Sequence, residues 1–134
     1  MQKILVVTVI FIDKNNKILM EKHRTNQTMQ NLWQFPGGKV ESNELLKSAA
    51  RREVKEELNI NISSSSLAPL TFENYQSNNK HFIIFYFICR NWKGVITNKE
   101  DQTLRWFGLN EIKTSEIIPY NHKALQQLFE FLEK

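Results

Sequence analysis

Two long, predominantly apolar runs predict the central strands of a β-sheet. They cover residues 3–13 and 81–90, are rich in Val, Ile or Phe, and are apolar on both faces that a strand presents. Shorter runs predict further strands at residues 17–22, 70–75 and 103–107. A fourth short apolar segment, residues 32–35, ends at Pro36-Gly37-Gly38.

A helical period replaces this pattern twice, at residues 44–58 and 121–134. The apolar side of the second predicted helix consists of Ala124, Leu125, Leu128, Phe129 and Leu132. The chain contains no internal repeat and no low-complexity tract. Strands that alternate with two helices predict a single α/β domain over residues 1–134, with a mixed β-sheet between the helices.

The composition limits the classes of function. With 134 residues, 41% of them apolar, and 4 Gly and 3 Pro, the chain is long enough for one hydrophobic core and excludes collagen-like or linker sequences. A formal charge of +4 fits an anionic small molecule, whereas no basic stripe predicts a nucleic-acid polymer as partner. Cys89 is the single cysteine, and no apolar run approaches the roughly 20 residues of a membrane span. We therefore expect a cytoplasmic protein that needs neither a membrane nor an obligate protein partner.

The helix predicted at residues 44–58 carries acidic residues on its apolar side. At about 100° per residue, its leucines and alanines spread over one broad arc and its basic residues lie on the opposite, solvent side. Glu53, Glu56 and Glu57 fall at roughly −20°, −80° and +20° from Leu46. The period therefore predicts that three carboxylates share the side of the helix that faces the core.

Such a placement costs free energy unless a cation compensates it. Like charges three or four residues apart destabilise a helix slightly, and the helix dipole disfavours acidic residues in the last turn. Burial adds a larger desolvation cost unless the charge is paired or bound to a cation. A solvated acidic face is the alternative, although basic residues already occupy the solvent side. Carboxylates without His or Cys favour Mg²⁺, or Mn²⁺, over zinc.

The segment that precedes this helix, Pro36-Gly37-Gly38-Lys39, fits the binding of a phosphate. Hard cations held by a few carboxylates typically serve phosphate substrates. The two glycines remove side chains where a ligand can approach the backbone, and Lys39 adds a positive charge. Taken alone, a tight turn explains the two glycines equally well.

Eight positions in this region form one spaced motif: Gly38, Glu44, Arg52, Glu53, Val54, Glu56, Glu57 and Ile60. Their types and spacing resemble the Nudix box, and every charged position of that motif matches. Asn59 stands where the family has Gly, and Asn43 where many relatives have Gly. Asn is the non-Gly residue best suited to the left-handed conformation that such positions need.

Within this superfamily the chain is most similar to MutT-type 8-oxo-dGTP diphosphatases. The similarity rests on residues 33–41, on Lys99-Glu100 followed by residues 105–107, and on Asn121 ahead of the last helix. It implies a Nudix α/β/α sandwich. It also implies Mg²⁺-dependent hydrolysis of a nucleoside triphosphate, 8-oxo-dGTP, to the monophosphate and pyrophosphate, which removes a mutagenic nucleotide from the pool.

The resemblance further implies roles for individual residues. The metal ligands would be the carbonyl group of Gly37 and the side chains of Glu53, Glu56, Glu57 and Glu100. Arg52 would hold the motif together by pairing with carboxylates such as Glu44, and the general base would be Glu53 or Glu44. The nucleotide-binding positions would be His23, Arg24, Gln34, Phe35, Pro36, Gly37, Lys39, Lys80 and Asn121.

Plainer interpretations of these residues remain open. Phe35 can be a core residue, Asn121 an N-cap, Glu100 a surface residue, and His23, which stands where Arg is usual, an incidental loop residue. For the whole chain, one alternative is a Nudix pyrophosphatase for a pyrimidine triphosphate or a dinucleoside polyphosphate, the latter suggested by Tyr75. A non-catalytic nucleotide-binding module is the other, and the intact set of glutamates argues against it.

Overall fold

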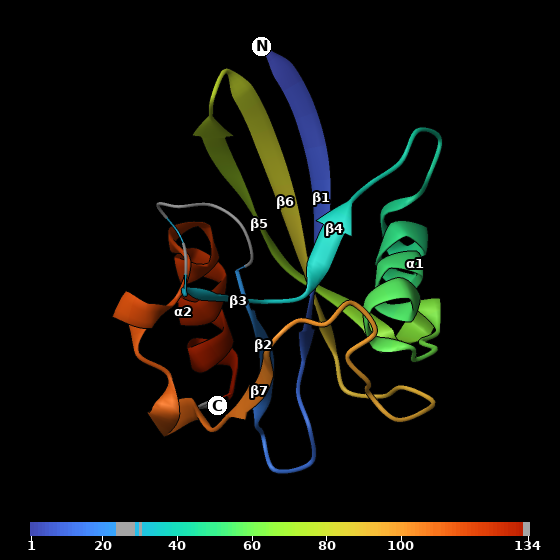
Figure 1. The fold of residues 1–134 in the computed structure, drawn as a ribbon, viewed down its shortest axis with the longest axis vertical. Coiled ribbons are helices and arrows are strands. Elements are labelled where there is room, and N and C mark those ends of the chain that lie inside the picture. The colour runs from blue at the N-terminus through green and yellow to red at the C-terminus, as the bar shows by residue number, and fades with distance from the viewer. Residues whose placement is uncertain (24–28, 30, 133–134) are drawn as a thin grey trace.

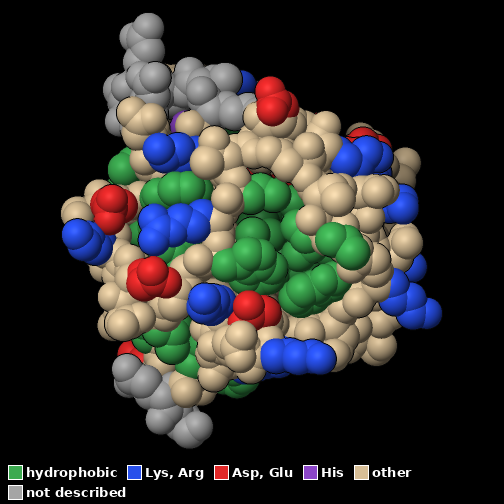
Figure 2. All heavy atoms as spheres, turned by 60° about the horizontal axis from the view of Figure 1, so that its bottom comes forward, with side chains coloured by type: hydrophobic (Ala, Val, Ile, Leu, Met, Phe, Trp, Pro, Cys, Tyr) green, Lys and Arg blue, Asp and Glu red, His purple; other side chains and the backbone are tan. Residues whose placement is uncertain are grey.

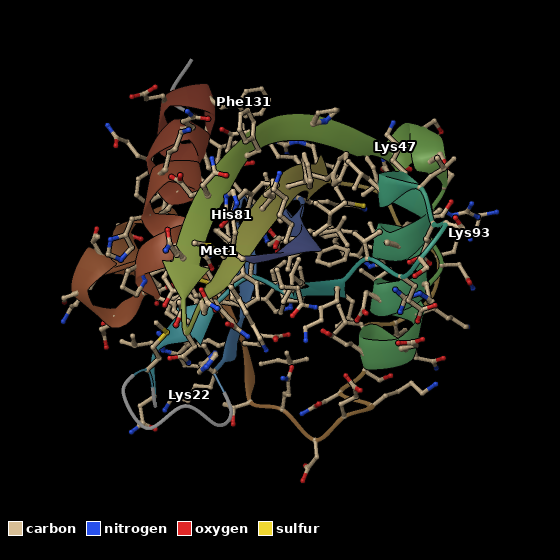
Figure 3. All side chains as sticks on the ribbon, turned by 90° about the horizontal axis from the view of Figure 1, so that it is seen from above. Met1, Lys22, Lys47, His81, Lys93 and Phe131 are labelled. Atoms are coloured by element: carbon tan, nitrogen blue, oxygen red, sulfur yellow. The ribbon has the colours of Figure 1, made fainter. Side chains whose placement is uncertain are left out.

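Two helices cover opposite sides of the strands in the computed structural model, which describes residues 1–23, 29 and 31–132. Helix α1 (Leu46–Leu58) lies on one side and helix α2 (His122–Leu132) on the other (Figure 1). Seen from above, Lys47 lies on the α1 side and Phe131 on the α2 side (Figure 3). This arrangement confirms the expected layering of helix, strands and helix.

The strands form two sheets. The first is mixed, has the order β4-β1-β6-β5, and pairs β1 with β6 in parallel and its other neighbours antiparallel. Its strands are β1 (Gln2–Phe11), β4 (Gly37–Lys39), β5 (Leu67–Ser77) and β6 (Lys80–Cys89). The second sheet is antiparallel, with the order β3-β2-β7. Its strands are β2 (Ile18–Lys22), β3 (Trp33–Gln34) and β7 (Leu104–Phe107). The mixed sheet expected from the sequence is thus accompanied by a second, smaller one.

Strand β1 contributes to a hydrophobic core on each side of the sheet. Ile10 packs in the core under α2, whereas Val9 and Phe11 pack in the core under α1. Successive side chains of a strand point to opposite faces, so a run that is apolar at every position can serve both cores. Only residues 7–11 are buried in this way, because the first half of β1 extends beyond both helices (Figure 1).

The Pro-Gly-Gly segment forms a strand rather than a turn. Gly37 and Gly38 belong to β4, which pairs with Thr8 and Val7 of β1. A Cβ atom on Gly37 would overlap the carbonyl oxygen of Val7, and one on Gly38 would overlap the carboxylate of Glu53. The glycines therefore let the backbone lie directly between β1 and α1. The interpretation of this segment as a plain tight turn is wrong.

Asparagines in the left-handed conformation end several elements. Helix α1 begins two residues later than expected, at Leu46, and ends as expected at Leu58. Asn59 follows with φ of 57°, and its N–H donates to the Lys55 carbonyl group, while Asn43 has φ of 62°. Both positions confirm why Asn stands there for Gly. The remaining short elements are the 3₁₀ helices η1 (Ser64–Ser66), η2 (Leu109–Glu111), η3 (Thr114–Glu116) and η4 (Pro119–Asn121).

Candidate active site

Arg52 joins several carboxylates around the start of α1. Its Nε and Nη2 atoms donate to the two oxygens of Glu44 at 2.8 and 2.9 Å, a bidentate pair. Its Nη1 atom donates to Glu53 at 2.9 Å and lies 3.4 Å from Glu56. Nη2 also donates to the carbonyl group of Lys39 in β4 at 3.0 Å. The expected pairing of Arg52 with Glu44 is present, and it also fastens β4 to α1.

The pKa values of Glu44 and Glu53, which both accept hydrogen bonds from Arg52, shift in opposite directions. Hydrogen bonding to Arg52 lowers the pKa of Glu44 to about 2. The pKa of Glu53 is raised, because desolvation outweighs its hydrogen bond with Arg52. Among the glutamates that Arg52 contacts, Glu44 is therefore held firmly as an anion, whereas Glu53 binds a proton more readily than an exposed carboxylate does.

Glu57 lies buried in the last turn of α1. Its side chain is 8% exposed, and its Oε2 atom has no hydrogen-bond partner within the part of the chain that the structure describes. Desolvation, followed by the charge and hydrogen bonding of nearby Glu21, raises the pKa of Glu57 to about 10. A buried carboxylate oxygen without a partner is costly, so this group fits a site that a ligand completes.

The expected burial of the three helix glutamates holds for Glu57 and partly for Glu53. It is wrong for Glu56, whose side chain is 53% exposed and reaches back to Arg52. Glu56 falls at the margin of the apolar arc, where a long side chain can turn toward solvent and a cation. Leu45 is also exposed, because it precedes the first turn of the helix.

The segment that carries Glu100 is fastened to the end of α1. The N–H groups of Thr97 and Lys99 donate to the carbonyl groups of Leu58 and Glu57, at 2.9 and 3.0 Å. These bonds satisfy carbonyl groups that a helix end leaves free. Glu100 itself is exposed, and its charge contributes to the raised pKa values of Glu53 and Glu57. A residue far along the chain thus adds a fourth carboxylate to this region.

A chain of polar side chains leads from Glu57 to the other end of the site. Gln34 of β3 donates through Nε2 to Glu21 Oε2 at 3.1 Å. The Oε1 atom of Gln34 lies 3.0 Å from His23 Nδ1 and accepts from the Tyr120 hydroxyl group at 3.3 Å. His23 and Gln34, both predicted to bind the nucleotide, are thus in direct contact.

His23 and Tyr120 border a cavity of about 230 Å³. Its other lining residues are Met29, Tyr75, Ser77, Asn78, Lys80 and Phe82. Lys80 is exposed at the start of β6, where its ammonium group can meet an anion at the mouth of the cavity. Tyr75, which the sequence associated with a dinucleotide, lies here as well.

Phe35 and Asn121 do not line this cavity and are buried in the core. Asn121 Oδ1 accepts from the Phe35 N–H at 3.1 Å, and its Nδ2 donates to the Tyr86 hydroxyl group at 2.9 Å. Tyr86 in turn donates to the carbonyl group of Tyr120 at 2.6 Å. The Asn121 side chain therefore joins Phe35, the residue that follows β3, to Tyr86 of β6 instead of capping α2. Phe35 packs edge-to-face on Tyr86, so its interpretation as a core residue is correct.

The remaining expected nucleotide contacts lie apart from the cavity. Pro36 is buried, and its carbonyl group accepts from the N–H of Val9. Lys39 is exposed beside Arg52 at the end of β4. Arg24 lies outside the described residues.

Sequence reasoning missed Glu21 and Gln102. Glu21 is 2% exposed. When the Gln102 amide is oriented with its nitrogen toward Glu21, that nitrogen lies 2.8 and 3.1 Å from the two oxygens of the Glu21 carboxylate. The signal was available, because alternation along β2 puts Glu21 on the same face as Leu19, which packs in the core under α1. A carboxylate on that face points toward the helix that carries the other glutamates.

The carboxylates do not converge on one point. Among the described residues, no three carboxylate, imidazole or thiol groups are close enough together to hold a metal ion as they stand. Arg52 holds Glu53 and Glu56 on its own side, whereas Glu57 points toward Glu21. A metal ion would have to draw these side chains together.

Two features of the whole molecule bear on its class. Within the described ranges, none of the helices has the length and apolar character that crossing a membrane requires. On the face shown in Figure 2, basic and acidic side chains are scattered around an apolar area rather than gathered into a basic stripe.

The fold and the Arg-Glu motif define the class of protein. A family model described as "NUDIX domain" matches residues 2–128, so the chain belongs to the NUDIX family of hydrolases. An "8-oxo-dGTP diphosphatase" of Buchnera aphidicola is 34% identical over 107 residues, which cover 80% of this chain and 79% of the relative. A "CTP pyrophosphohydrolase" of Escherichia coli is 38% identical over 58 residues, 43% of each chain.

A solved structure agrees with this classification. The crystal structure of a MutT NUDIX hydrolase from Burkholderia pseudomallei superimposes with a TM-score of 0.83 at 23% identity. The match covers 96% of this chain and 99% of that one. At this identity the likeness establishes the fold, and the family assignment rests on the sequence match.

Proposed function

We propose that this NUDIX hydrolase cleaves 8-oxo-dGTP to 8-oxo-dGMP and pyrophosphate with the help of Mg²⁺. The observation that carries the proposal is the buried Glu57 carboxylate, left without a partner for Oε2 among the described residues and surrounded by further glutamates. Such a group is stable as an anion only when a cation reaches it. A triphosphate substrate and a divalent cation would enter this site together.

The residues that would hold Mg²⁺ are Glu53, Glu56, Glu57 and Glu100, with the carbonyl group of Gly37. Their donor chemistry fits, because carboxylate and carbonyl oxygens suit Mg²⁺ and Mn²⁺ and no His or Cys is among them. Mn²⁺ would be accepted in its place. When bound, the cation supplies positive charge against the phosphates and makes nearby water more acidic.

Glu53 is the better general base. Its pKa is raised by desolvation, and its carboxylate lies against the glycine backbone of β4, where a phosphate can approach. Glu44, the alternative, is held by two hydrogen bonds from Arg52 and has a pKa of about 2, so it accepts a proton poorly. Arg52 and Glu44 therefore act as positioning residues.

The proton balance of the reaction follows from this assignment. Glu53 takes a proton from the attacking water while the water oxygen forms a bond to the β-phosphorus. The bond between the β-phosphorus and the oxygen shared with the α-phosphate breaks. The α-phosphate leaves as the nucleoside monophosphate and the other two phosphates as pyrophosphate.

The cavity at the other end of the polar chain would take the base and the sugar. His23 and Tyr120, both in contact with Gln34, offer hydrogen bonds there, and Lys80 offers a positive charge. Asn121, bonded to Phe35 and Tyr86, would act indirectly, because Tyr86 donates to the carbonyl group of Tyr120, which borders the cavity. The Buchnera relative named for 8-oxo-dGTP supports this choice of substrate.

CTP is the second candidate substrate. It is favoured by the Escherichia coli relative named for CTP, which is 38% identical over 58 residues. A pyrimidine is smaller than a purine and would fill less of the cavity.

The test is to measure kcat/KM for 8-oxo-dGTP, dGTP, CTP and a diadenosine polyphosphate with Mg²⁺ and with Mn²⁺. Release of the monophosphate, of pyrophosphate and of inorganic phosphate is followed separately, so that cleavage at the terminal phosphate is recognised. We expect 8-oxo-dGTP to give the highest value and pyrophosphate to be the product. A higher value for CTP would replace the substrate, and release of inorganic phosphate alone would contradict the site of attack.

A further inference from the structure

Glu21 occupies the middle of the site and has no part in the chemistry proposed above. It lies on β2, 2% exposed, directly opposite Gln34 of β3. Gln34 Nε2 donates to its Oε2 atom at 3.1 Å. The amide nitrogen of Gln102, oriented toward Glu21, lies 2.8 and 3.1 Å from the two Glu21 oxygens. Two amide nitrogens therefore meet at one carboxylate.

Gln34 connects this carboxylate to the cavity. The nitrogen of its amide faces Glu21, and the oxygen of the same amide faces His23 and Tyr120. Both of these residues line the cavity that also contains Lys80. The amide therefore presents an acceptor, and not a donor, to the two side chains that border the cavity.

The orientation of this amide depends on the carboxylate. A hydroxyl group can donate or accept, and an imidazole nitrogen does either according to its tautomer. His23 and Tyr120 are therefore compatible with both orientations of the Gln34 amide. A carboxylate accepts at both oxygens, so a contact with Glu21 requires the nitrogen of the amide on its side. Glu21 is the contact that distinguishes the two orientations.

We propose that Glu21 is a positioning residue that holds the Gln34 oxygen toward His23 and Tyr120. These two side chains then donate to Gln34 and keep their remaining acceptor positions for the cavity, so that the pocket selects a nucleobase presenting an N–H donor. The inference rests on the proposed function, in which the cavity bordered by His23 and Tyr120 takes the base. An acceptor buried against a base without a donor loses its hydrogen bond, which lowers transition-state binding for that base. Guanine and 8-oxoguanine carry N–H donors on their edges, whereas unsubstituted purine carries none.

The first experiment compares dGTP with the deoxynucleoside triphosphate of unsubstituted purine. We expect the wild-type protein to prefer dGTP in kcat/KM, and Glu21→Leu to reduce this preference by about tenfold or more, with most of the change in KM. Leucine removes the acceptor without adding a charge to the core. Glu130→Leu, which removes an exposed carboxylate of α2, is the matched control and should keep the wild-type ratio. An unchanged ratio in Glu21→Leu would overturn the proposal.

A paired exchange tests the same contact without loss of volume. Gln34→Glu places two carboxylates against each other and should lower the preference for dGTP. Adding Glu21→Gln restores one amide-to-carboxylate hydrogen bond in the reversed direction and again presents an oxygen to His23 and Tyr120. We expect the double variant to recover the wild-type ratio. A double variant as poor as Gln34→Glu alone would contradict the role of Glu21.

A readout without turnover separates this proposal from the proposed function. The side-chain amide signals of Gln34 in ¹⁵N NMR spectra can be assigned by their absence in Gln34→Glu. We expect them to shift in metal-free Glu21→Leu and to stay in place in Glu130→Leu. If the wild-type protein hydrolyses no nucleotide, the proposed function fails while this shift still supports the positioning role. Gln34 signals that stay unchanged in Glu21→Leu overturn the positioning role whatever the activity.

Discussion

Two glutamates on opposite sides of Arg52 show how differently one site can treat the same side chain. Glu44 receives two hydrogen bonds from Arg52, which lower its pKa to about 2. Glu57 lies at the far end of α1, buried beside Glu21, and its pKa is raised to about 10. The guanidinium group reaches the first carboxylate and not the second.

The charged groups around Arg52 are satisfied within the chain, whereas those around Glu57 are not. Around Arg52, the carboxylates of Glu44 and Glu53 and the carbonyl group of Lys39 satisfy the guanidinium group, so this part of the site is complete within the chain. Around Glu57, desolvation and neighbouring negative charges remain uncompensated. The energetic cost is concentrated where a cation and its phosphate would bind.

The largest effect is expected from Glu57→Gln, which removes the uncompensated charge. We expect kcat to fall by about 10²–10³-fold, as for other groups that stabilise charge in a transition state. The free energy of unfolding of the metal-free protein should stay the same or rise, because a neutral amide is less costly to bury. Activity assays and urea denaturation check both parts, with Glu130→Gln as control. Near-normal turnover in Glu57→Gln would refute its role as a metal ligand.

Arg52→Met instead tests the hydrogen-bonded carboxylates around Arg52. We expect the free energy of unfolding to drop by about 2–3 kcal/mol, below the range for fully buried pairs because Arg52 is partly exposed. The loss arises because the Glu44 and Glu53 carboxylates would face each other without a cation. Arg51→Met is the matched control, since Arg51 is exposed and its Nε donates to the Ile62 carbonyl group. Urea denaturation that gives equal stability for both variants would show that Arg52 is dispensable.

The free energy of unfolding at acid pH tests the hydrogen-bonded state of Glu44. Its pKa is about 2 in the folded protein against a usual 4.5, so the folded state binds this proton less tightly than the unfolded state does. The contribution to stability is therefore complete above about pH 4.5 and is lost as the pH falls toward 2. Glu44→Gln should flatten this part of the curve, measured by urea denaturation at several pH values. Parallel curves for the wild type and Glu44→Gln would contradict the assignment, and Glu130→Gln, at an exposed position of α2, should leave the curve unchanged.

The smallest effect concerns the helix end that carries Glu57. Asn59 has φ of 57°, so Asn59→Gly should raise the free energy of unfolding by a few tenths of a kcal/mol and Asn59→Ala should lower it by about 1 kcal/mol. Thermal and urea denaturation measure both changes. If Asn59→Ala were as stable as the wild type, the left-handed end of α1 would not be needed to place Glu57.

The motif could predict much of the arrangement around Arg52. The resemblance to the Nudix box implied that Glu44, which lies just before α1, pairs with Arg52 in its second turn, and the two side chains do meet. The burial of Glu57 follows from the helical period. The prediction of burial is wrong for Glu56, because a long side chain at the margin of the apolar arc can turn outward toward Arg52. The metal-binding roles of these glutamates stay predictions, since they depend on a group outside the chain.

The sequence by itself determined the layered fold, the helix with its glutamates and the asparagines that replace glycine, because these depend on periodicity and on backbone conformations of single residues. Only the tertiary structure decided that Gly37–Lys39 forms a strand, that Asn121 bonds to Phe35, and that Glu21 lies beside Glu57. These contacts join residues up to 86 positions apart. No local pattern encodes them, since they depend on how the two sheets and helices pack against one another.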